Sequence, residues 1–493
     1  MRKVLWGAAA VLLALAVFAG VLLVRTWTLG VPPGGGATPA PPEPSPVAVD
    51  VQGAARRLGE AVRIPTVSHQ DPRENDPAAW TQLHDWIART YPRFSAVARR
   101  ESPPGTAALL WTWPGGDPSL APVLLMAHQD VVPVAPETAG EWRRPPFSGE
   151  LAEGAVWGRG SIDDKGSLVA LLEAAEALAA KGYRPRRTIL IASGHDEEAG
   201  GTGARAVAAL LKARGVRPLF ALDEGSVVIA DHPVTGGPVA IVGVAEKGYS
   251  TLTVEARGEG GHSSAPPKET AVVSLARAVE RIAGRPFPLR YRGVAAEGLE
   301  ALAPDLPFVQ RLAVANAWLF RPLLVSTFAK TPQGAAMLHT TLAPTMLEGS
   351  PKENVLPQTA RARINYRIAP GDTSADVMAR ARKAVAGLPV RLLWETPPNE
   401  PTPVSSTRSE GWRRVTSALA ASYGGRPPPI SPGLVIAATD GRAMSGVAQD
   451  VYRLQPIRFA LKDTGRIHGV NERLAVEDLR RMVEFYARLM TQG

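Results

Sequence analysis

Histidine and carboxylate residues recur in five short segments of this 493-residue chain. The segments, each with its candidate residues, are LLMAHQDVVP (His128, Asp130), WGRGSIDDKGS (Asp163, Asp164), IASGHDEEAGG (Asp196, Glu197, Glu198), FALDEGS (Asp223, Glu224) and GRIHGVNERL (His468). Imidazole nitrogens and carboxylate oxygens are ligands of hydrolytic metal sites, and the chain has no cysteine that could add a thiolate. The pattern therefore predicts a metal-dependent hydrolase whose site only folding can assemble.

Each of these residues has a simpler explanation when it is taken alone. A histidine near a strand end is more often hydrogen-bonded structure than a ligand, and Asp163-Asp164 could cap the helix that follows. The two residues Glu197 and Glu198 are adjacent and cannot face the same way, so one can bind metal while the other acts as a general base. A carboxylate at Asp163 can bridge two cations, and such a pair can activate water. The combination favours a metal site.

Buried strands are predicted next to these residues. The runs 121–128 and 187–193 are short, apolar and rich in branched side chains, which is typical of strands buried on both faces, and 219–223 is the next predicted strand. Helical spacing is found between them, in 165–181 and in ARAVAALLKARG. This alternation predicts an α/β fold with a mainly parallel central sheet flanked by helices. The candidate residues would then meet where the strands run out into loops.

The pattern changes near Gly248. The stretches 250–258 and 360–370 alternate apolar and polar residues, as half-exposed antiparallel strands do. We therefore predict an inserted α+β lid domain over 248–371. It contains an unusually apolar stretch, 313–329, which is either a buried helix or a hydrophobic wall.

The catalytic domain is predicted in two parts, 47–247 and 372–493, because the chain must return to the first domain to supply His468. Residues 31–46, which precede the catalytic domain, are almost wholly Pro, Gly, Ala and Ser, a composition typical of a semi-extended spacer.

Residues 1–30 are predicted to be a transmembrane anchor. Arg2 and Lys3 precede an uncharged apolar run from Val4 to Val24, which is long enough to cross a bilayer. Basic residues before the run predict a cytoplasmic amino terminus and a catalytic body exported to the periplasmic or extracellular side. The alternative is a cleaved signal peptide, because small residues within the run could form a cleavage site.

The composition limits the partners. The net charge is +9, but Lys and Arg are dispersed rather than grouped in blocks, so we predict no nucleic-acid partner. An anionic substrate or a phospholipid surface is an equally good reason for the excess of positive charge. The absence of cysteine excludes disulfides and a cysteine nucleophile.

The segments AHQDVVP, WGRGSIDDKG, GHDEEAGG and HGVNERL resemble those of the M20 metallopeptidases, the dizinc carboxypeptidases and aminoacylases. The match is collinear from about Thr66 to the carboxyl end. The WLF-containing insert and the N-terminal span are most similar to the carboxypeptidase S and PM20D1-like branch. That branch acts on peptides with a free carboxyl end or on N-acyl amino acids, so the resemblance implies a zinc-peptidase-like fold and amide hydrolysis.

The resemblance implies a ligand set for two zinc ions. His128 and Asp223 would hold one ion, Glu198 and His468 the other, and Asp163 would bridge them, with a cis peptide bond to the following residue.

The resemblance also implies catalytic and substrate-binding residues. Asp130 would orient the first histidine ligand, and Glu197 would be the general base. His262, in GEGGHSSAPP, would stabilise the oxyanion, although it could also be a turn histidine. Arg367 would pair with the substrate's terminal carboxylate, with Arg442 in ATDGRAM as a second candidate for that task.

Other questions stay open at this stage. Asn354 is predicted to donate a hydrogen bond to the substrate, and hinge closure is expected to bring the lid residues to the site. A homodimer is one arrangement, because lids of this family often dimerise, and a large insert that replaces the partner is the other. The alternative functions are a membrane-tethered, non-catalytic binding protein and a deacylase of small acyl groups such as acetyl or succinyl.

Overall fold

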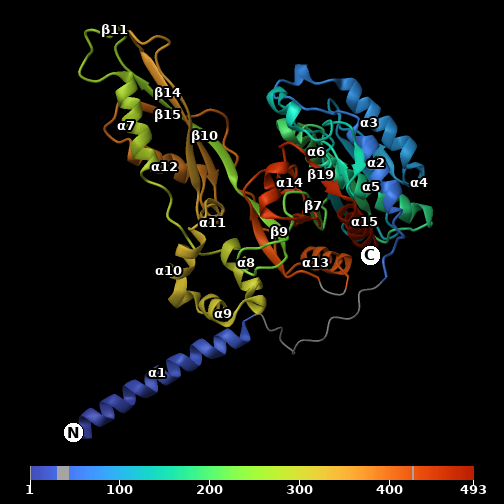
Figure 1. Ribbon diagram of the computed structural model, residues 1–493, viewed down its shortest axis with the longest axis horizontal. Helices are drawn as coiled ribbons and strands as arrows, with labels where there is room; N and C mark the ends of the chain where they lie inside the picture. The colour runs from blue at the N-terminus through green and yellow to red at the C-terminus, as the bar shows by residue number, and fades with distance from the viewer. Residues whose placement is uncertain (1, 30–43, 425–426, 493) are drawn as a thin grey trace.

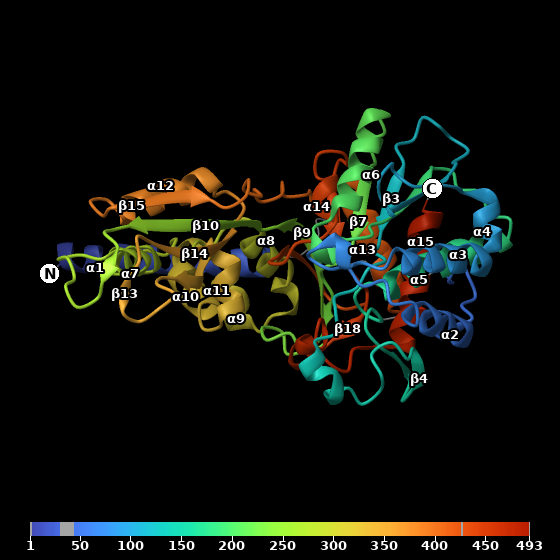
Figure 2. The same cartoon turned by 90° about the horizontal axis from the view of Figure 1, so that it is seen from above.

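The computed structural model describes residues 2–29, 44–424 and 427–492 (Figures 1 and 2). We refer to three parts of it: the catalytic body, with its sheet and flanking helices; the lid, from β10 to β15 without the helices α8–α11; and the helical insert, α8–α11. The predicted α/β fold is confirmed. Most of the predicted spacer lies outside the described residues, since 30–43 are not among them.

The catalytic body is built on a ten-stranded sheet. Its strands in spatial order are β1 Arg99–Glu101, β2 Leu109–Trp113, β6 Ile189–Ser193, β3 Val123–Met126, β7 Phe220–Asp223, β17 Val451–Arg453, β9 Val239–Glu246, β8 Val228–Ile229 and β18 Arg458–Phe459, with β16 Ile430–Val435 also paired to β9. The central strands β6, β3, β7 and β17 are parallel to one another. Antiparallel pairs such as β2 with β6 and β8 with β9 make the sheet mixed overall.

Helices cover both faces of this sheet. They are α2 Val51–Val62, α3 Pro77–Thr90, α4 Pro92–Val97, α5 Lys165–Ala180, α6 Thr202–Ala213, α13 Glu410–Ser422, α14 Gly441–Met444 and α15 Val476–Thr491. Successive strand residues point to opposite faces. Leu125 and Ile191 accordingly join the core shared with α2, α5 and α15, whereas Leu124 and Leu190 join the core under α6 and α14. Both faces of the central strands are therefore buried, as their continuous apolar runs predict.

Short elements complete the body. A three-stranded sheet of β4 Glu150–Ala152, β5 Ala155–Trp157 and β19 Arg473–Ala475 joins the C-terminal segment to the loop before α5. The 3-10 helices of the chain are η1 Pro72–Glu74, η2 Pro136–Glu141, η3 Glu197–Ala199, η4 Ala303–Asp305 and η5 Leu461–Arg466. The small sheet matters for the site because it fixes the segment that carries His468.

The lid is a four-stranded antiparallel sheet in the order β12-β14-β10-β15, backed by two helices. Its elements are β10 Gly248–Arg257, β11 Gly261–His262, α7 Ala271–Ala283, β12 Thr341–Glu348, β13 Val355–Leu356, β14 Thr359–Ile368, α12 Ser374–Ala384 and β15 Val390–Trp394. The lid sheet continues past the predicted boundary at 371, because β15 pairs with β10 and α12 buries Val377 and Ala381 in the lid core. The chain returns to the catalytic body only after β15.

The helical insert consists of α8 Val294–Ala301, α9 Phe308–Ala315, α10 Ala317–Phe328 and α11 Pro332–Leu338. The apolar stretch 313–329 forms the end of α9, which is buried, and all of α10, in which Leu324 is the one buried residue and several other side chains are exposed. The N-terminal helix α1 Arg2–Thr28 projects from this insert (Figure 1). Its segment Leu5–Thr28 is long and apolar enough to cross a membrane, a property that signal sequences share.

Candidate metal centre

Asp163 lies between two histidines. Its Oδ1 is 2.9 Å from Nε2 of His128, and its Oδ2 is 3.1 Å from Nε2 of His468. The Nε2 atom of His468 also lies 3.0 Å from Oε1 of Glu198. One carboxylate thus faces two imidazoles through different oxygens, which is the arrangement that a carboxylate bridging two ions requires.

Three groups of residues could each hold a metal ion, with ligand atoms that all lie within 4.8 Å of one another. The groups are His128 with Asp163 and Glu224, Asp163 with Glu198 and His468, and His128 with Glu197 and Glu198. The first two groups have only Asp163 in common. Folding therefore brings together four of the five predicted ligands, from segments separated by up to 340 residues of sequence (468 − 128).

Asp223, the fifth predicted ligand, is not part of any of these groups in the described residues, and its neighbour Glu224 takes that place. Asp223 is the last residue of β7, and its Oδ2 accepts a hydrogen bond of 2.5 Å from the backbone N–H of Gly441. Adjacent residues at a strand end point in different directions. In the structure Glu224 lies in a group with His128, while Asp223 is held by the Gly441 N–H, and the sequence gives no sign of this difference.

The elements that carry these residues converge at the carboxyl ends of the central strands. His128 follows β3, η3 with Glu197 and Glu198 follows β6, and Glu224 follows β7. Asp163 lies just before α5, and its peptide bond to Asp164 is cis. These central strands are parallel, so their carboxyl ends share one edge of the sheet, where open α/β folds place their ligands.

Asp130 ties the first histidine to the glutamate turn. Its Oδ1 lies 3.3 Å from Nδ1 of His128, and its backbone oxygen lies 3.0 Å from the same nitrogen. Its carboxylate also accepts hydrogen bonds from the backbone N–H groups of Glu197 (3.1 Å) and Glu198 (3.2 Å) and from the Ser68 hydroxyl (2.5 Å). A single buried carboxylate therefore fixes the positions of an imidazole and of both glutamates.

A second buried carboxylate, Glu472, holds the Asp163 loop. Its Oε1 accepts hydrogen bonds from the backbone N–H groups of Ile162 (2.9 Å) and Asp163 (3.2 Å), and its Oε2 is 2.7 Å from Nη1 of Arg159. Arg159 also donates to the backbone oxygen of His468 at 2.9 Å. The Arg159–Glu472 pair thus joins the loop of His468 to the loop of Asp163.

The electrostatics of the cluster are those of crowded carboxylates. Burial raises the pKa of Glu197 and of Glu224 well above the usual value, and neighbouring carboxylates add repulsion. Hydrogen bonds to Asp163 and Glu198 raise the pKa of His468 to about 10. Burial alone would lower the pKa of His128, but Asp130 and Asp163 raise it well above its usual value. A divalent cation among these oxygens would replace repulsion with attraction. Oxygen and imidazole donors without thiolate fit zinc, and also cobalt or manganese.

Two predicted substrate residues, His262 and Asn354, lie together at the far tip of the lid. The strand of His262, β11, pairs with β13, and the backbone N–H of Ser263 donates to the backbone oxygen of Asn354 at 3.1 Å. Figures 1 and 2 place this tip far from β7 and α14 of the catalytic body. The structure therefore does not bring these two residues to the predicted metal ligands of their own chain.

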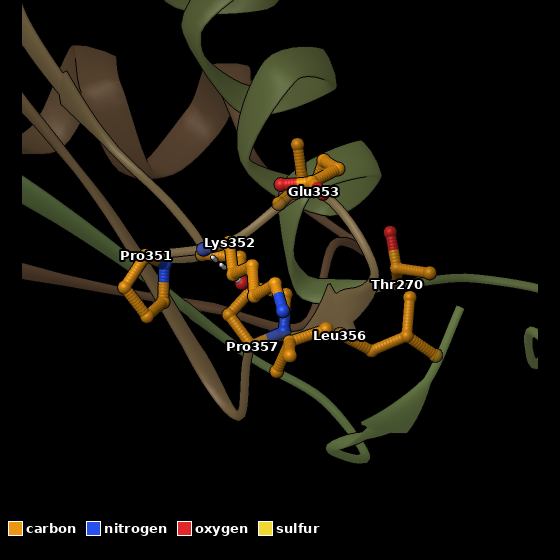
Figure 3. A pocket seen from close by; sticks show the side chains of 9 residues that line it. Thr270, Pro351, Lys352, Glu353, Leu356 and Pro357 are labelled. Atoms are coloured by element: carbon orange, nitrogen blue, oxygen red, sulfur yellow. Dashed lines mark hydrogen bonds between the residues drawn. The ribbon is translucent and has the colours of Figure 1, made fainter.

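A shallow hollow lies beside this tip (Figure 3). Its lining residues are Thr270, Val272, Ser350, Pro351, Lys352, Glu353, Val355, Leu356 and Pro357. None of the residues predicted for the metal site or for substrate binding lines it, so we do not assign it to the catalytic reaction.

Arg367 lies on β14 at the opposite, inner end of the lid, and Arg442 lies on α14 of the catalytic body, where it contacts the backbone just before β10. The guanidinium of Arg367 stacks over the Tyr249 ring with its centre 4.6 Å from the ring centroid, and within the described residues it has no carboxylate partner. Desolvation lowers its pKa. Arg442 is already engaged, since it donates to the backbone oxygens of Glu400 and Lys247 and lies 3.2 Å from Oε2 of Glu246. Arg367 is thus the half-buried cation that can accept an anionic partner.

The structure draws attention to two acids that the predicted site did not include. Glu224 follows the predicted ligand Asp223, and it is Glu224 that lies in a candidate ligand group with His128 and Asp163. Asp440, in the ATDGRAM segment, is 6% exposed, and within the described residues neither carboxylate oxygen has a hydrogen-bond partner. Its Oδ2 lies only 1.8 Å from the point that a Cβ at position 194 would occupy. Position 194, just before the HDEE segment, therefore accepts only glycine. In the sequence, Asp440 stands two residues before Arg442, and nothing there distinguishes a buried carboxylate from an exposed one.

Solved structures share the fold at low sequence identity. An M20 family metallo-carboxypeptidase from Sulfolobus solfataricus has a TM-score of 0.64 and 18% identity, covering 89% of this chain and 98% of that chain. Human carnosine dipeptidase 1 has a TM-score of 0.58 and 16% identity, covering 90% of this chain and 99% of that chain. These likenesses concern the fold alone.

Closer relatives are found by sequence. Human N-fatty-acyl-amino acid synthase/hydrolase PM20D1 is 36% identical over 441 residues, which cover 88% of this chain and 86% of that protein. A probable carboxypeptidase S-like protein of Dictyostelium discoideum is 32% identical over 442 residues, covering 88% and 84%. Residues 124–492 match the family described as peptidase family M20/M25/M40. The resemblance read from the motifs is confirmed, and the chain belongs to the peptidase family M20/M25/M40.

Proposed function

We propose that this protein hydrolyses the amide bond of N-acyl amino acids, with peptides that have a free carboxyl end as the second substrate class. The observation that supports this most directly is Asp163, whose two oxygens are divided between His128 and His468. The unpaired guanidinium of Arg367 adds a place for the substrate's carboxylate. Relatives are named N-fatty-acyl-amino acid synthase/hydrolase and probable carboxypeptidase S-like, and these names support the two classes of substrate.

Two zinc ions are the proposed cofactors. One would be held by His128, Asp163 and Glu224, and the other by Asp163, Glu198 and His468. In this assignment Glu224 replaces the predicted Asp223. When bound, such a pair of ions would make water more acidic and polarise the scissile carbonyl group.

Glu197 is the proposed general base. It lies in the His128–Glu197–Glu198 group but in neither of the two groups that share Asp163. Its backbone is fixed by Asp130. In hydrolysis its carboxylate would take a proton from water as the oxygen adds to the carbonyl carbon, and would give that proton to the nitrogen as the C–N bond breaks. The raised pKa that burial gives this carboxyl group in the metal-free protein suits a group that both accepts and releases a proton.

The function is tested with matched substrates on the zinc-loaded full-length chain. We expect turnover of N-acyl amino acids with a free carboxylate, and at least a tenfold lower kcat/KM for the same compounds as carboxamides, because the charge-assisted contact with Arg367 is lost. A panel of dipeptides with free carboxyl ends measures the second class. No turnover of any of these compounds by protein with two bound zinc ions would favour a non-catalytic binding protein, and turnover of acetyl or succinyl compounds alone would favour a small-acyl deacylase.

Metal content distinguishes the two adjacent acids after β7. We expect Glu224→Gln to lose about one zinc ion per chain, because it removes a charged ligand of one ion and leaves the three residues of the other group intact. Asp223→Asn should keep both ions, since that side chain instead accepts the Gly441 N–H. Elemental analysis of both purified variants after dialysis is the measurement. Loss of zinc from Asp223→Asn with retention in Glu224→Gln would restore the assignment made from the sequence.

Arg367→Ala is expected to raise KM for N-acyl amino acids about 10- to 100-fold, the value of a hydrogen-bonded ion pair. Steady-state kinetics should show little change for the carboxamide analogues, which lack the charge that Arg367 would bind. Arg361→Ala is the matched control, because it removes an arginine of the same strand that pairs with Glu255. An equal loss for acid and carboxamide substrates would mean that Arg367 stabilises the structure and does not bind the carboxylate.

We also propose a homodimer in which each lid supplies His262 to its partner. His262 is exposed at the lid tip, away from its own metal cluster. The lid sheet has an open edge at β12, where Met346 and Leu347 are exposed, and Val272 and Val273 of α7 are exposed as well. An apolar edge strand of this kind readily pairs with a second copy across a two-fold axis.

Subunit mixing tests this arrangement. His262→Ala and Glu197→Gln chains should each be inactive alone, yet mixed dimers should contain one site with an intact base and an intact partner histidine. Random reassociation is then expected to restore about a quarter of the wild-type activity. If His262 acts within its own chain, no mixed dimer has an intact site, and the mixture stays inactive.

The N-terminal helix is proposed to be a single membrane span with the catalytic body exported. Lys3 at its start and the uncharged Leu5–Val24 stretch that follows support this orientation. Protease protection of intact cells distinguishes a retained span from a cleaved signal sequence, which would leave a shortened soluble chain.

A further inference from the structure

The helical insert contacts α1 within the apolar part of that helix. The rings of Phe18 and Trp318 meet edge to face, 6.0 Å apart. The side-chain N–H of Asn316 donates to the backbone oxygen of Leu22 (3.1 Å) and to Oγ1 of Thr26 (3.3 Å). Arg25 donates to the backbone oxygen of Ala315, the last residue of α9, at 3.1 Å. Aromatic, polar and charged contacts thus fix the carboxyl half of α1 against the start of α10.

These contacts lie at a definite depth along the candidate span. It runs from Leu5 to Thr28, and a helix rises about 1.5 Å per residue, so Phe18 is about 15 Å from the end of the span. The apolar core of a bilayer is about 30 Å thick. If α1 crosses a membrane, Phe18 lies inside the apolar region, and Trp318 beside it must lie at a similar depth. The N–H groups of the buried Asn316 bond to α1, as polar side chains between membrane helices do.

The composition of α10 and its flanks suits contact with lipid. Trp318, Leu319 and Leu323 are exposed, with fractions of 53%, 40% and 55%. Between Leu306 and Leu347 the chain has no acidic residue, and its basic residues are Arg311, Arg321 and Lys330. Exposed apolar side chains together with positive charge are typical of helices that bind an anionic lipid surface.

We propose that α10 is inserted into the outer leaflet of the bilayer beside α1, so that the helical insert is a second membrane contact of the catalytic chain. The inference rests on the proposed span α1. The occupant of the exposed face is lipid, because this face is continuous with the span through Phe18 and Asn316. The consequence is that the body is held at a fixed height and orientation above the membrane.

The natural chain has no cysteine, so a single probe can be placed anywhere in the full-length protein. We would introduce Leu319→Cys and Leu323→Cys on α10, Leu12→Cys on α1, and Val97→Cys on α4 of the catalytic body as the matched exposed control. Leu12 and Val97 are 67% and 42% exposed. Each variant is labelled with an environment-sensitive fluorophore in vesicles of phosphatidylcholine and phosphatidylglycerol. Emission is then quenched in turn by nitroxide-bearing lipids and by aqueous iodide.

The proposal expects the α10 probes to lose emission to lipid nitroxides as the Leu12 probe does, and to resist iodide, while the Val97 probe shows the reverse. If Leu12 is quenched by lipid but both α10 probes behave like Val97, the span exists and α10 is not inserted. If all four probes respond only to iodide, α1 is not a span and the inference fails with it. None of these outcomes depends on amide hydrolysis, so the proposed activity is judged separately by the substrate panel.

Discussion

Asp163→Ala is expected to lose both zinc ions together and to reduce amide hydrolysis by at least about a thousandfold, because the ions supply several kcal/mol of transition-state stabilisation. The reason is the division of one carboxylate between His128 and His468, at 2.9 and 3.1 Å. Without it each site keeps two of its three ligands, and the remaining carboxylates repel one another without a shared counter-charge. Elemental analysis and kcat/KM of the same preparation are the measurements.

The control for this variant is Asp85→Asn, an exposed acid on α3 of the catalytic body. It should keep two zinc ions and full activity. Thermal unfolding of the metal-free proteins must be similar for Asp163→Ala and the parent, since otherwise metal loss could follow from misfolding. Loss of a single ion from Asp163→Ala, with the second ion retained at parental affinity, would contradict a bridging role for this residue.

Glu197→Gln is expected to retain both zinc ions and to lower kcat by about 10²- to 10⁴-fold, the usual effect of removing a general base. The amide keeps the shape of the side chain but cannot accept the proton from water. KM should change little, because Glu197 belongs to neither of the groups that share Asp163. The measurement combines steady-state kinetics with metal content.

Glu137→Gln, an exposed residue of η2, controls for the loss of a negative charge on the catalytic body. A strong fall in zinc content with Glu197→Gln would show that this residue is a ligand, as the third group with His128 and Glu198 permits. Near-normal turnover with zinc present would instead mean that another group accepts the proton. Zinc content and turnover together therefore show whether Glu197 is a metal ligand or the general base.

The sequence predicted that the candidate metal ligands lie at the ends of buried strands. Apolar runs before His128, Glu197 and Glu224 predicted strands, and the helical pattern of 165–181 predicted α5 nearly residue for residue. These features are local, because a buried parallel strand must be apolar on both faces and a buried helix must be apolar around its circumference. The family motifs then supplied the chemistry, because their residue types and order are constrained together.

Directions and distant pairings needed the tertiary structure. Asp223 and Glu224 are chemically almost alike, and only the twist at the end of β7 decides which of them faces His128. The membership of β15 in the lid depended on its pairing with β10 across more than a hundred residues.

By itself the sequence determined a metal-dependent peptidase of the M20 type, its α/β core, and the segments that supply the ligands, since these depend on residue type and local periodicity. Only the tertiary structure decided that Glu224 and not Asp223 joins the cluster, that His262 lies at the far end of the lid, and that α10 contacts α1. Each of these depends on the direction of a side chain or on a contact between distant segments. Neither property produces a periodic pattern in the amino-acid sequence.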